Sequence, residues 1–163
     1  MSLPSDDELV NIARLLGEQL CSHGERLVLA ESCTGGWIAK VITDLPGSSV
    51  WFDRGFVTYS NESKVQQLGV DPDLIDRYGA VSQETVAAMA EGALVRSQAH
   101  LSIAASGIAG PGGGSTEKPS GTVWLAWARL DQVTQTRCFH FPGERETVRR
   151  QAVAHALQGA ITP

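Results

Sequence analysis

Two short apolar runs, neither of which alternates with polar residues, constrain the fold of this chain most strongly. The first is Arg26–Ala30 and the second is His100–Ser106. A run of this kind is typical of a strand that is buried on both faces of a sheet. Such a strand needs helices on both sides, so the sequence predicts an α/β protein.

Helical patterns and further strands surround these two runs. A capping box, Ser5 to Glu8, opens the first helix, which should end at Gly24. The other expected helices are Trp37–Leu45, Asn61–Leu68 with Asn61 as cap, Asp71–Gly79, Ser82–Ser97 and Glu144–Leu157. The other expected strands are Val50–Tyr59, Gly121–Leu130 and Thr134–Phe141, the last two joined by a tight turn near Asp131 and Gln132. The predicted fold is a three-layer α/β/α sandwich with a mixed sheet, in a single domain over residues 1–163 with its core at about 8–160.

Composition limits the class of protein. The 163 residues are 42% hydrophobic and 19% charged, which is ordinary for one globular domain. The net charge is −5 and the cations are scattered, so nucleic acid is not expected as a partner. No apolar run is long enough to span a membrane, and the odd set of Cys21, Cys33 and Cys138 suits a reducing compartment. We therefore expect a cytoplasmic protein.

The loop Glu31–Gly36 is the first candidate site, because it joins a buried strand to a helix. Ligands of such sheets gather at the carboxyl ends of strands, where helix N-termini stabilise negative charge. Ser32 could be a nucleophile there. Two alternatives stay open: Ser32 or Thr34 caps the helix, or Cys33 is the nucleophile with its pKa lowered by the helix N-terminus.

A serine nucleophile needs a base, and no histidine stands in a spacing that suggests a Ser-His-Asp triad. Lys64 follows the second strand and could reach the sheet edge that carries Ser32, with Tyr59 relaying or orienting its proton. For this role Lys64 must be partly desolvated. The alternative is an ordinary solvated lysine in the first turn of a helix.

The glycine-rich loop Gly107–Gly114 is a second candidate site, because its backbone permits a close approach. It lacks the lysine of a P-loop, and a flexible connection explains it equally well. Arg145 stands near the start of the last helix, where a cation opposes the helix dipole unless it meets an anion or a neighbouring Glu144 or Glu146. No motif predicts a metal site or a cofactor.

Several of these segments together resemble the competence-damage-inducible CinA C-terminal domain family over about residues 8–160. The matching segments are Ala30–Gly36, Tyr59–Lys64, Gly79–Ser82, Gly107–Pro111 and Gly143–Arg145. The resemblance implies an amidase that converts nicotinamide mononucleotide to nicotinate mononucleotide and ammonia without a metal. It implies Ser32 as nucleophile, Lys64 as base and Tyr59 as an assistant in proton transfer. The implied oxyanion and substrate-binding residues are Thr34, Gly35, Gly36, Asn61, Ser106, Gly107, Gly110, Gly112 and Arg145.

The chain departs from the family pattern at Ser106, where threonine is common, and at Gly112, where a polar residue is frequent. Ser106 keeps the hydroxyl. Gly112 lacks a side chain, a change expected to alter ligand contacts while the set of Ser32, Tyr59 and Lys64 stays intact. The larger N-terminal domain of long family members is missing, which implies a stand-alone form. A catalytically silent nucleotide-binding or interaction domain is the alternative function, and a phosphate-ester hydrolase comes last. Apolar surface from Trp51, Phe52, Trp124 and Trp127 would pair chains, so a homodimer is expected.

Overall fold

The two continuously apolar runs form neighbouring central strands, β1 (Leu27–Glu31) and β3 (Leu101–Gly107), in the computed structural model, which describes residues 3–161. Within that range they belong to one five-stranded sheet of order β2-β1-β3-β4-β5. The other strands are β2 (Phe52–Val57), β4 (Thr122–Arg129) and β5 (Gln135–His140). β1 pairs in parallel with β2 and with β3, whereas β3, β4 and β5 pair antiparallel. The sheet is therefore mixed, as predicted.

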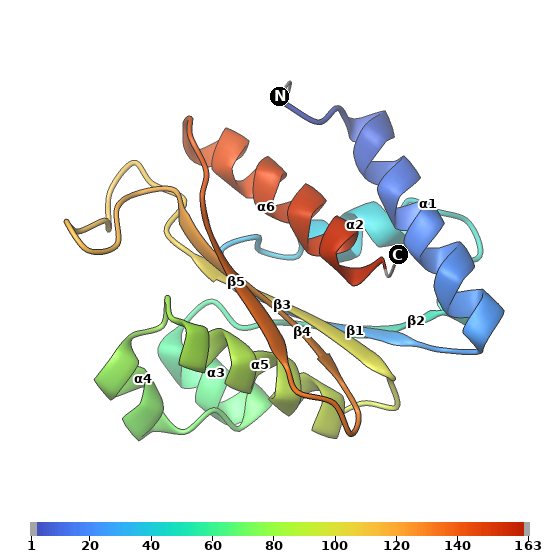
Figure 1. The fold of residues 1–163 in the computed structure, drawn as a ribbon, viewed down its shortest axis with the longest axis horizontal. Coiled ribbons are helices and arrows are strands. Elements are labelled where there is room, and N and C mark those ends of the chain that lie inside the picture. Colours follow the sequence, from blue (N-terminus) through green and yellow to red (C-terminus); the bar gives the residue numbers. More distant parts are fainter. Residues whose placement is uncertain (1–2, 162–163) are drawn as a thin grey trace.

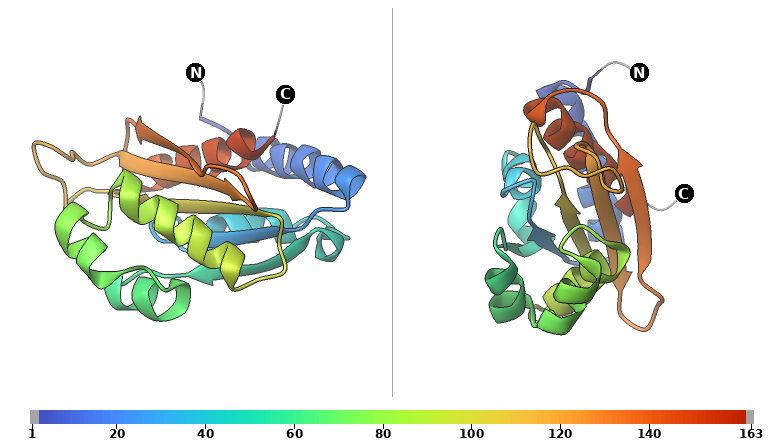
Figure 2. Two further views of the ribbon diagram at one scale, coloured as in Figure 1. Left: turned by 60° about the horizontal axis from the view of Figure 1, so that its bottom comes forward. Right: turned by 90° about the vertical axis from the view of Figure 1, so that its left-hand side faces the viewer.

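Helices cover both faces of this sheet. The helices are α1 (Asp6–His23), α2 (Trp37–Thr43), α3 (Asn61–Leu68), α4 (Pro72–Tyr78), α5 (Gln83–Val95) and α6 (Arg145–Ala160), with a 3-10 helix η1 (Ser48–Val50). α1, α2 and α6 lie on one face, and α3, α4 and α5 lie on the other (Figures 1 and 2). The predicted three-layer α/β/α sandwich is confirmed.

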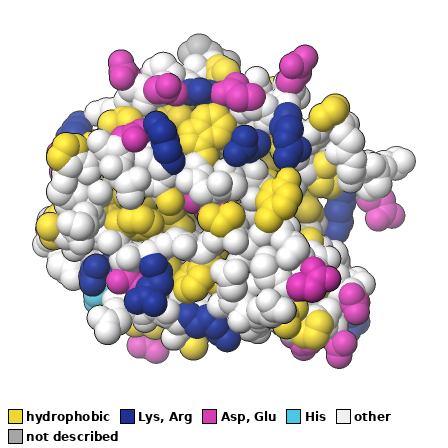
Figure 3. Space-filling view, turned by 180° about the vertical axis from the view of Figure 1, so that it is seen from behind, with side chains coloured by type: hydrophobic (Ala, Val, Ile, Leu, Met, Phe, Trp, Pro, Cys, Tyr) yellow, Lys and Arg dark blue, Asp and Glu magenta, His cyan; other side chains and the backbone are white. Residues whose placement is uncertain are grey.

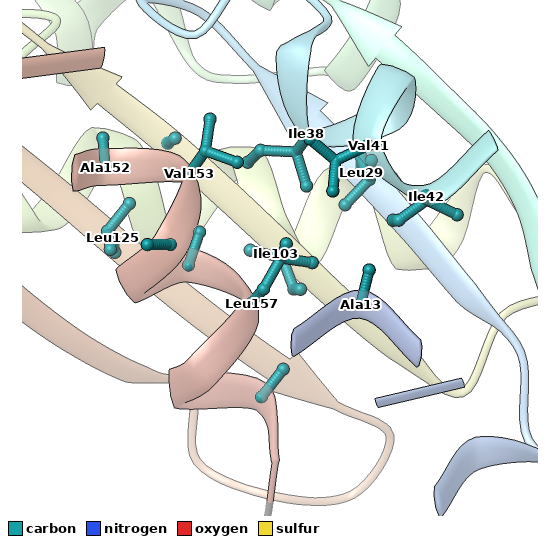
Figure 4. Close-up of a cluster of buried hydrophobic side chains, with 14 of the residues drawn as sticks. Ala13, Leu29, Ile38, Val41, Ile42, Ile103, Leu125, Ala152, Val153 and Leu157 are labelled. Atoms are coloured by element: carbon teal, nitrogen blue, oxygen red, sulfur yellow. The ribbon is translucent and has the colours of Figure 1, made fainter. Parts of the chain in front are cut away.

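Each face of the sheet has its own apolar core. On the first face, Leu29 and Ile103 of the sheet meet Ile38 of α2 and Leu157 of α6 (Figure 4). On the second face, Val28 and Ala30 pack with α5. Successive β1 side chains thus point to opposite faces, which is the period of a strand. By the same alternation, Glu31 at the end of β1 should point to the first face, and Ser32, the next residue, to the second.

Most element ends follow the signals in the sequence. The capping box at Ser5 and the left-handed Gly24 bound α1, and Ser82 caps α5. One predicted cap is wrong: Ser60 caps α3, and Asn61 is its first helical residue. Both residue types are good N-caps, so the local sequence did not distinguish these adjacent positions.

The tryptophans expected to form a dimer surface are packed within the chain. Trp51 is 5% exposed, and the indole N–H of Trp127 donates to Ala156 O of α6 at 2.9 Å. Trp124 and Phe52 pack against the second and first cores respectively. On the face drawn in Figure 3, apolar side chains form small separate areas among charged ones. The aromatic residues therefore do not provide the surface on which the expected dimer was based.

Candidate active site

A cavity of about 250 Å³ lies at the carboxyl ends of the parallel strands. In the sheet, β1 lies between β2 and β3. The chain passes from β1 through α2 to β2 on one side of β1 and later returns to form β3 on the other side, so the strand order reverses at β1. Crevices at such a reversal are the usual ligand sites of open α/β sheets. The ends of β1 and β3 both contribute to this cavity.

Most of the residues predicted for the site line this cavity. Those that do are Ser32, Tyr59, Asn61, Lys64, Ser106, Gly107, Gly110, Gly112 and Arg145. The topology brings them together because the loop after β1, the start of α3 and the loop after β3 all lie at one end of the sheet. Thr34, Gly35 and Gly36 are not among the lining residues.

Ser32 and Lys64 are in direct contact. Lys64 Nζ lies 3.0 Å from Ser32 Oγ and donates to Thr58 O at 2.9 Å. Because Leu29 and Glu31 point to the α2 face, Ser32 points to the opposite face, where α3 presents Lys64. The alternation of β1 therefore directs Ser32 to this face, and α3, which follows β2, places Lys64 against it.

Lys64 is almost completely buried, with 1% of its surface exposed, so the solvated alternative is wrong. Burial disfavours the charged ammonium, and it lowers the pKa of Lys64 below the ordinary value of 10.5. A neutral lysine has one lone pair and two N–H groups. Thr58 O can accept one N–H while the lone pair faces the Ser32 hydroxyl, which is the arrangement of a base and its nucleophile.

Glu31 explains why Ser32 is not a helix cap. Its buried carboxylate accepts from the N–H groups of Gly36 and Ile38, both at 3.1 Å, and of Ala39 at 2.9 Å. The residue at the N-cap position, Gly36, has no side chain to offer. The interpretation of Ser32 or Thr34 as the cap is therefore wrong, and the Ser32 hydroxyl is left for Lys64.

The same contacts bear on the expected oxyanion donors. Gly36 N–H is bound to Glu31, and Gly35 N–H donates to Ser32 O at 3.0 Å. The Thr34 hydroxyl is buried and has no hydrogen-bond partner among the described residues. Instead, Cys33 lines the cavity, and its N–H donates to no other described residue. The Cys33 N–H therefore remains available as a donor, whereas those of Gly35 and Gly36 are already bound.

The thiol of Cys33 does not fit the role of nucleophile. It is buried, and burial together with the charge of Glu31 raises the pKa of Cys33 to about 12. The thiolate, which is the reactive form, is thereby disfavoured. The helix N-terminus that was expected to lower this pKa is already occupied by the Glu31 carboxylate.

Tyr59 lies at the rim of the cavity and is 64% exposed. Its hydroxyl accepts from Arg145 NH2 at 3.0 Å, and Arg145 NH1 donates to Gly110 O at 2.8 Å. No hydrogen bond joins Tyr59 to Lys64 within residues 3–161. Lys64 is instead oriented by its hydrogen bond to Thr58 O. Arg145 links Tyr59 at the rim of the cavity to Gly110 of the glycine-rich loop, and it does not pair with Glu144 or Glu146 among the described residues.

Two glycines of that loop are needed because other residues of the same protein lie close to their backbone. A Cβ on Gly107 would lie 2.7 Å from Val123 Cγ2, and one on Gly110 would lie 2.1 Å from Ser120 Oγ. Gly112 has open space around it. The close approach that the composition suggested is therefore made at Gly107 and Gly110 by neighbouring residues of the same protein.

Ser106 lines the cavity, but its hydroxyl is bound within the protein. It is 1% exposed and donates its hydroxyl to Ala80 O at 2.7 Å. The bond ties the end of β3 to the segment before α5. The hydroxyl that Ser106 shares with threonine is thus used within the protein.

A larger groove of about 740 Å³ lies between the start of α1 and α6. Its polar lining residues include His155 and Gln151, and His155 Nδ1 lies 2.9 Å from Gln151 O, which ties the ring to its own helix. No lining residue forms a nucleophile and base pair like Ser32 and Lys64, so the chemistry points to the smaller cavity. Among the described residues, no group of three or more His, Cys, Asp or Glu side chains could hold a metal ion, and no helix is long and apolar enough to cross a membrane.

Three residues that orient Ser32, its turn or Lys64 were not predicted as site residues: Glu31, Thr58 and Arg149. Arg149 donates from Nε to Cys33 O and from NH2 to Thr34 O, both at 3.0 Å. An acidic residue just before a helix is a signal that could have suggested Glu31 as a cap. Arg149 lies 116 residues from Cys33, and no local pattern reports such a contact.

Fold and site together define an α/β/α domain with a buried serine and lysine pair at the switch point of its sheet, a class of arrangement suited to acyl transfer. The chain belongs to the CinA C-terminal domain family, whose model matches residues 9–162. The family resemblance seen in the sequence is thereby confirmed.

Individual relatives agree over nearly the whole chain. A nicotinamide-nucleotide amidohydrolase PncC of Escherichia coli K12 is 53% identical over 156 residues, which are 94% of this chain and 93% of that protein. One of Pseudomonas putida is 52% identical over 95% of this chain and 96% of that protein. The crystal structure of a competence/damage inducible protein, CihA of Agrobacterium tumefaciens, superposes with a TM-score of 0.91 at 42% identity, covering 98% of this chain and 96% of that one.

Proposed function

We propose that this chain is a nicotinamide-nucleotide amidohydrolase that converts nicotinamide mononucleotide to nicotinate mononucleotide and ammonia. The observation that carries the proposal is the contact of 3.0 Å between Ser32 Oγ and the buried Lys64 Nζ. The similarity to two amidohydrolases of that name over more than nine-tenths of the chain supports the choice of substrate. Free thiols at Cys21, Cys33 and Cys138 suit the reducing cytoplasm in which such a nucleotide would be met.

The proposed reaction proceeds by acyl transfer. Neutral Lys64 takes the proton of the Ser32 hydroxyl while Oγ attacks the carboxamide carbon, and the Cys33 N–H stabilises the oxyanion. The tetrahedral adduct collapses when Lys64 returns the proton to the nitrogen, the C–N bond breaks and ammonia leaves. Lys64 then takes a proton from water, which attacks the ester and releases the acid as Ser32 recovers its proton.

The function is tested by measuring ammonia release from nicotinamide mononucleotide in the presence of a metal chelator. We expect steady turnover, and no ammonia from nicotinate mononucleotide, which lacks the amide. If the parent chain binds the nucleotide by calorimetry but releases no ammonia, it is a silent nucleotide-binding domain instead. If chelator abolishes the turnover and added metal restores it, the metal-free scheme is wrong.

We assign Arg145 to the nucleotide phosphate, because it is exposed at the rim and carries more donors than its two contacts use. Arg145→Gln should raise KM for nicotinamide mononucleotide by about 10- to 100-fold, the loss expected for a charge-assisted pair, with kcat within a few-fold. Nicotinamide riboside, which has no phosphate, is the control, and its KM should stay unchanged. An equal rise for the riboside would mean that Arg145 only holds Tyr59 and Gly110 in place.

A further inference from the structure

The turn that carries Ser32 is bound from the side of α6 by Arg149. The guanidinium is half-buried, stacks 5.3 Å from the ring centroid of Trp37, and donates to Cys33 O and Thr34 O. The fit is close, because a Cβ on Gly35 would lie 3.4 Å from Arg149 NH2. Arg149 itself does not line the cavity.

These two bonds orient the backbone on the far side of the turn. In a planar trans peptide, the N–H and the C=O point in opposite directions. Holding Thr34 O toward Arg149 therefore turns the Gly35 N–H away from it, where it donates to Ser32 O at 3.0 Å. This bond in turn fixes the peptide between Ser32 and Cys33, so the Cys33 N–H is directed away from Gly35.

The rest of the turn is fixed by other contacts. Ser32 N–H donates to Ala105 O at 2.9 Å, which ties the start of the turn to β3. Glu31 holds the N–H groups of Gly36, Ile38 and Ala39 at its end. Residues 33–35 lie between these anchors. Arg149 is the side chain that binds the carbonyl groups of Cys33 and Thr34, and the Trp37 N–H also donates to Thr34 O at 3.0 Å.

We propose that Arg149 is a positioning residue that holds the Cys33 N–H as a donor to the oxyanion formed when Ser32 adds to its substrate. The inference rests on the proposed acyl transfer at Ser32. Cys33 lines the cavity beside Ser32, and its N–H donates to no other described residue, although it interacts with the thiol of Cys33 itself. A single oxyanion donor is worth about 10²- to 10³-fold in kcat, so a misdirected Cys33 N–H should slow the chemistry and leave ground-state binding intact.

The first measurement compares Arg149→Met and Arg149→Lys with the parent. Both should lower kcat by about 30- to 100-fold while KM changes by less than about threefold, because lysine keeps the charge but not the two-pronged geometry. Arg150→Met is the matched control: Arg150 stacks on the same Trp37 at 5.0 Å but binds Asp6, Glu146 and Pro4 O. It should lose stability without losing kcat.

The second measurement does not depend on amide hydrolysis. Pyridine-3-boronic acid should add Ser32 Oγ to its boron as Lys64 takes the proton, giving a tetrahedral anion with an oxygen at the oxyanion position. Both folded Arg149 variants should bind this probe about 30- to 100-fold more weakly than the parent. In a Ser32→Ala background, Arg149→Met should leave the affinity for nicotinamide mononucleotide within about threefold.

Equal boronate affinity in the parent and the folded Arg149→Lys variant would overturn the inference, and so would a parent that binds no boronate. A parent that binds the boronate tightly but releases no ammonia would refute the proposed amidase alone. The comparison of boronate affinities would still decide the role of Arg149. Circular dichroism identifies any variant that fails to fold, and the lysine variant then carries the test.

Discussion

Ser32→Ala is expected to abolish ammonia release from nicotinamide mononucleotide, with kcat falling by about 10⁴-fold or more, as when other serine nucleophiles are removed. The carboxamide would then have no group to attack it, since the neighbouring thiol of Cys33 is held protonated by a pKa of about 12. Nucleotide affinity should change little, because Ser32 supplies only one small polar group to the cavity. Calorimetry on the variant measures that affinity directly.

Ser63→Ala is the matched control for this prediction. Ser63 lies in the first turn of α3, donates its hydroxyl to Ser60 O at 2.7 Å, and does not line the cavity. Its loss should leave kcat unchanged. If Ser32→Ala kept its activity and a further Cys33→Ala change removed it, the nucleophile would be Cys33 and the proposed mechanism would be wrong.

The sequence predicts the layers of this fold well because they depend on local patterns. Strands buried on both faces, such as β1 and β3, are written as unbroken apolar runs, and helices such as α1 and α5 carry caps at Ser5 and Ser82. Element ends are less certain where two good caps are adjacent, as at Ser60 and Asn61. Both can accept a hydrogen bond from the first turn, and only the backbone path decides between them.

In the site, too, the residues placed by local patterns could be predicted, whereas those placed by distant contacts could not. Lys64 could be placed near Ser32 because it follows β2, which is parallel to β1, at the same edge of the sheet. The groups that orient the pair were hidden, because each acts through a contact that sequence spacing does not report. Thr58 contributes a backbone carbonyl, Glu31 satisfies N–H groups five to eight residues away, and Arg149 reaches the turn from the last helix.

A buried lysine is favourable for catalysis and unfavourable for stability, so replacing it separates the two. Lys64→Met should lower kcat by about 10³-fold or more, since no other base lies within hydrogen-bond distance of Ser32 Oγ among the described residues. The same change removes an amine that is 1% exposed and substitutes an apolar side chain of similar length. We expect the variant to be more stable by about 0.5–2 kcal/mol, the gain typical of a single stabilising substitution.

The stability difference between the parent and Lys64→Met should depend on pH in a defined direction. Because the pKa of Lys64 is lowered in the folded state, the unfolded chain binds the extra proton at any pH between that lowered pKa and the ordinary value of 10.5. Parent stability therefore rises with pH through this window, and the advantage of Lys64→Met is full below it and disappears toward its upper end. For the same reason, kcat/KM of the parent should rise with pH and level off above the lowered pKa.

Thermal unfolding of the parent and of Lys64→Met at several pH values measures this window, at about 2–4 °C per kcal/mol for a chain of this size. Lys40→Met is the control, because Lys40 is exposed on α2 and paired with Asp44 at 2.6 Å. Its removal should leave kcat intact and cost a little stability at any pH at which both Lys40 and Asp44 are charged. A Lys64→Met variant that stays active, or one that is less stable than the parent at neutral pH, would show that Lys64 holds the fold together and does not serve as a desolvated base.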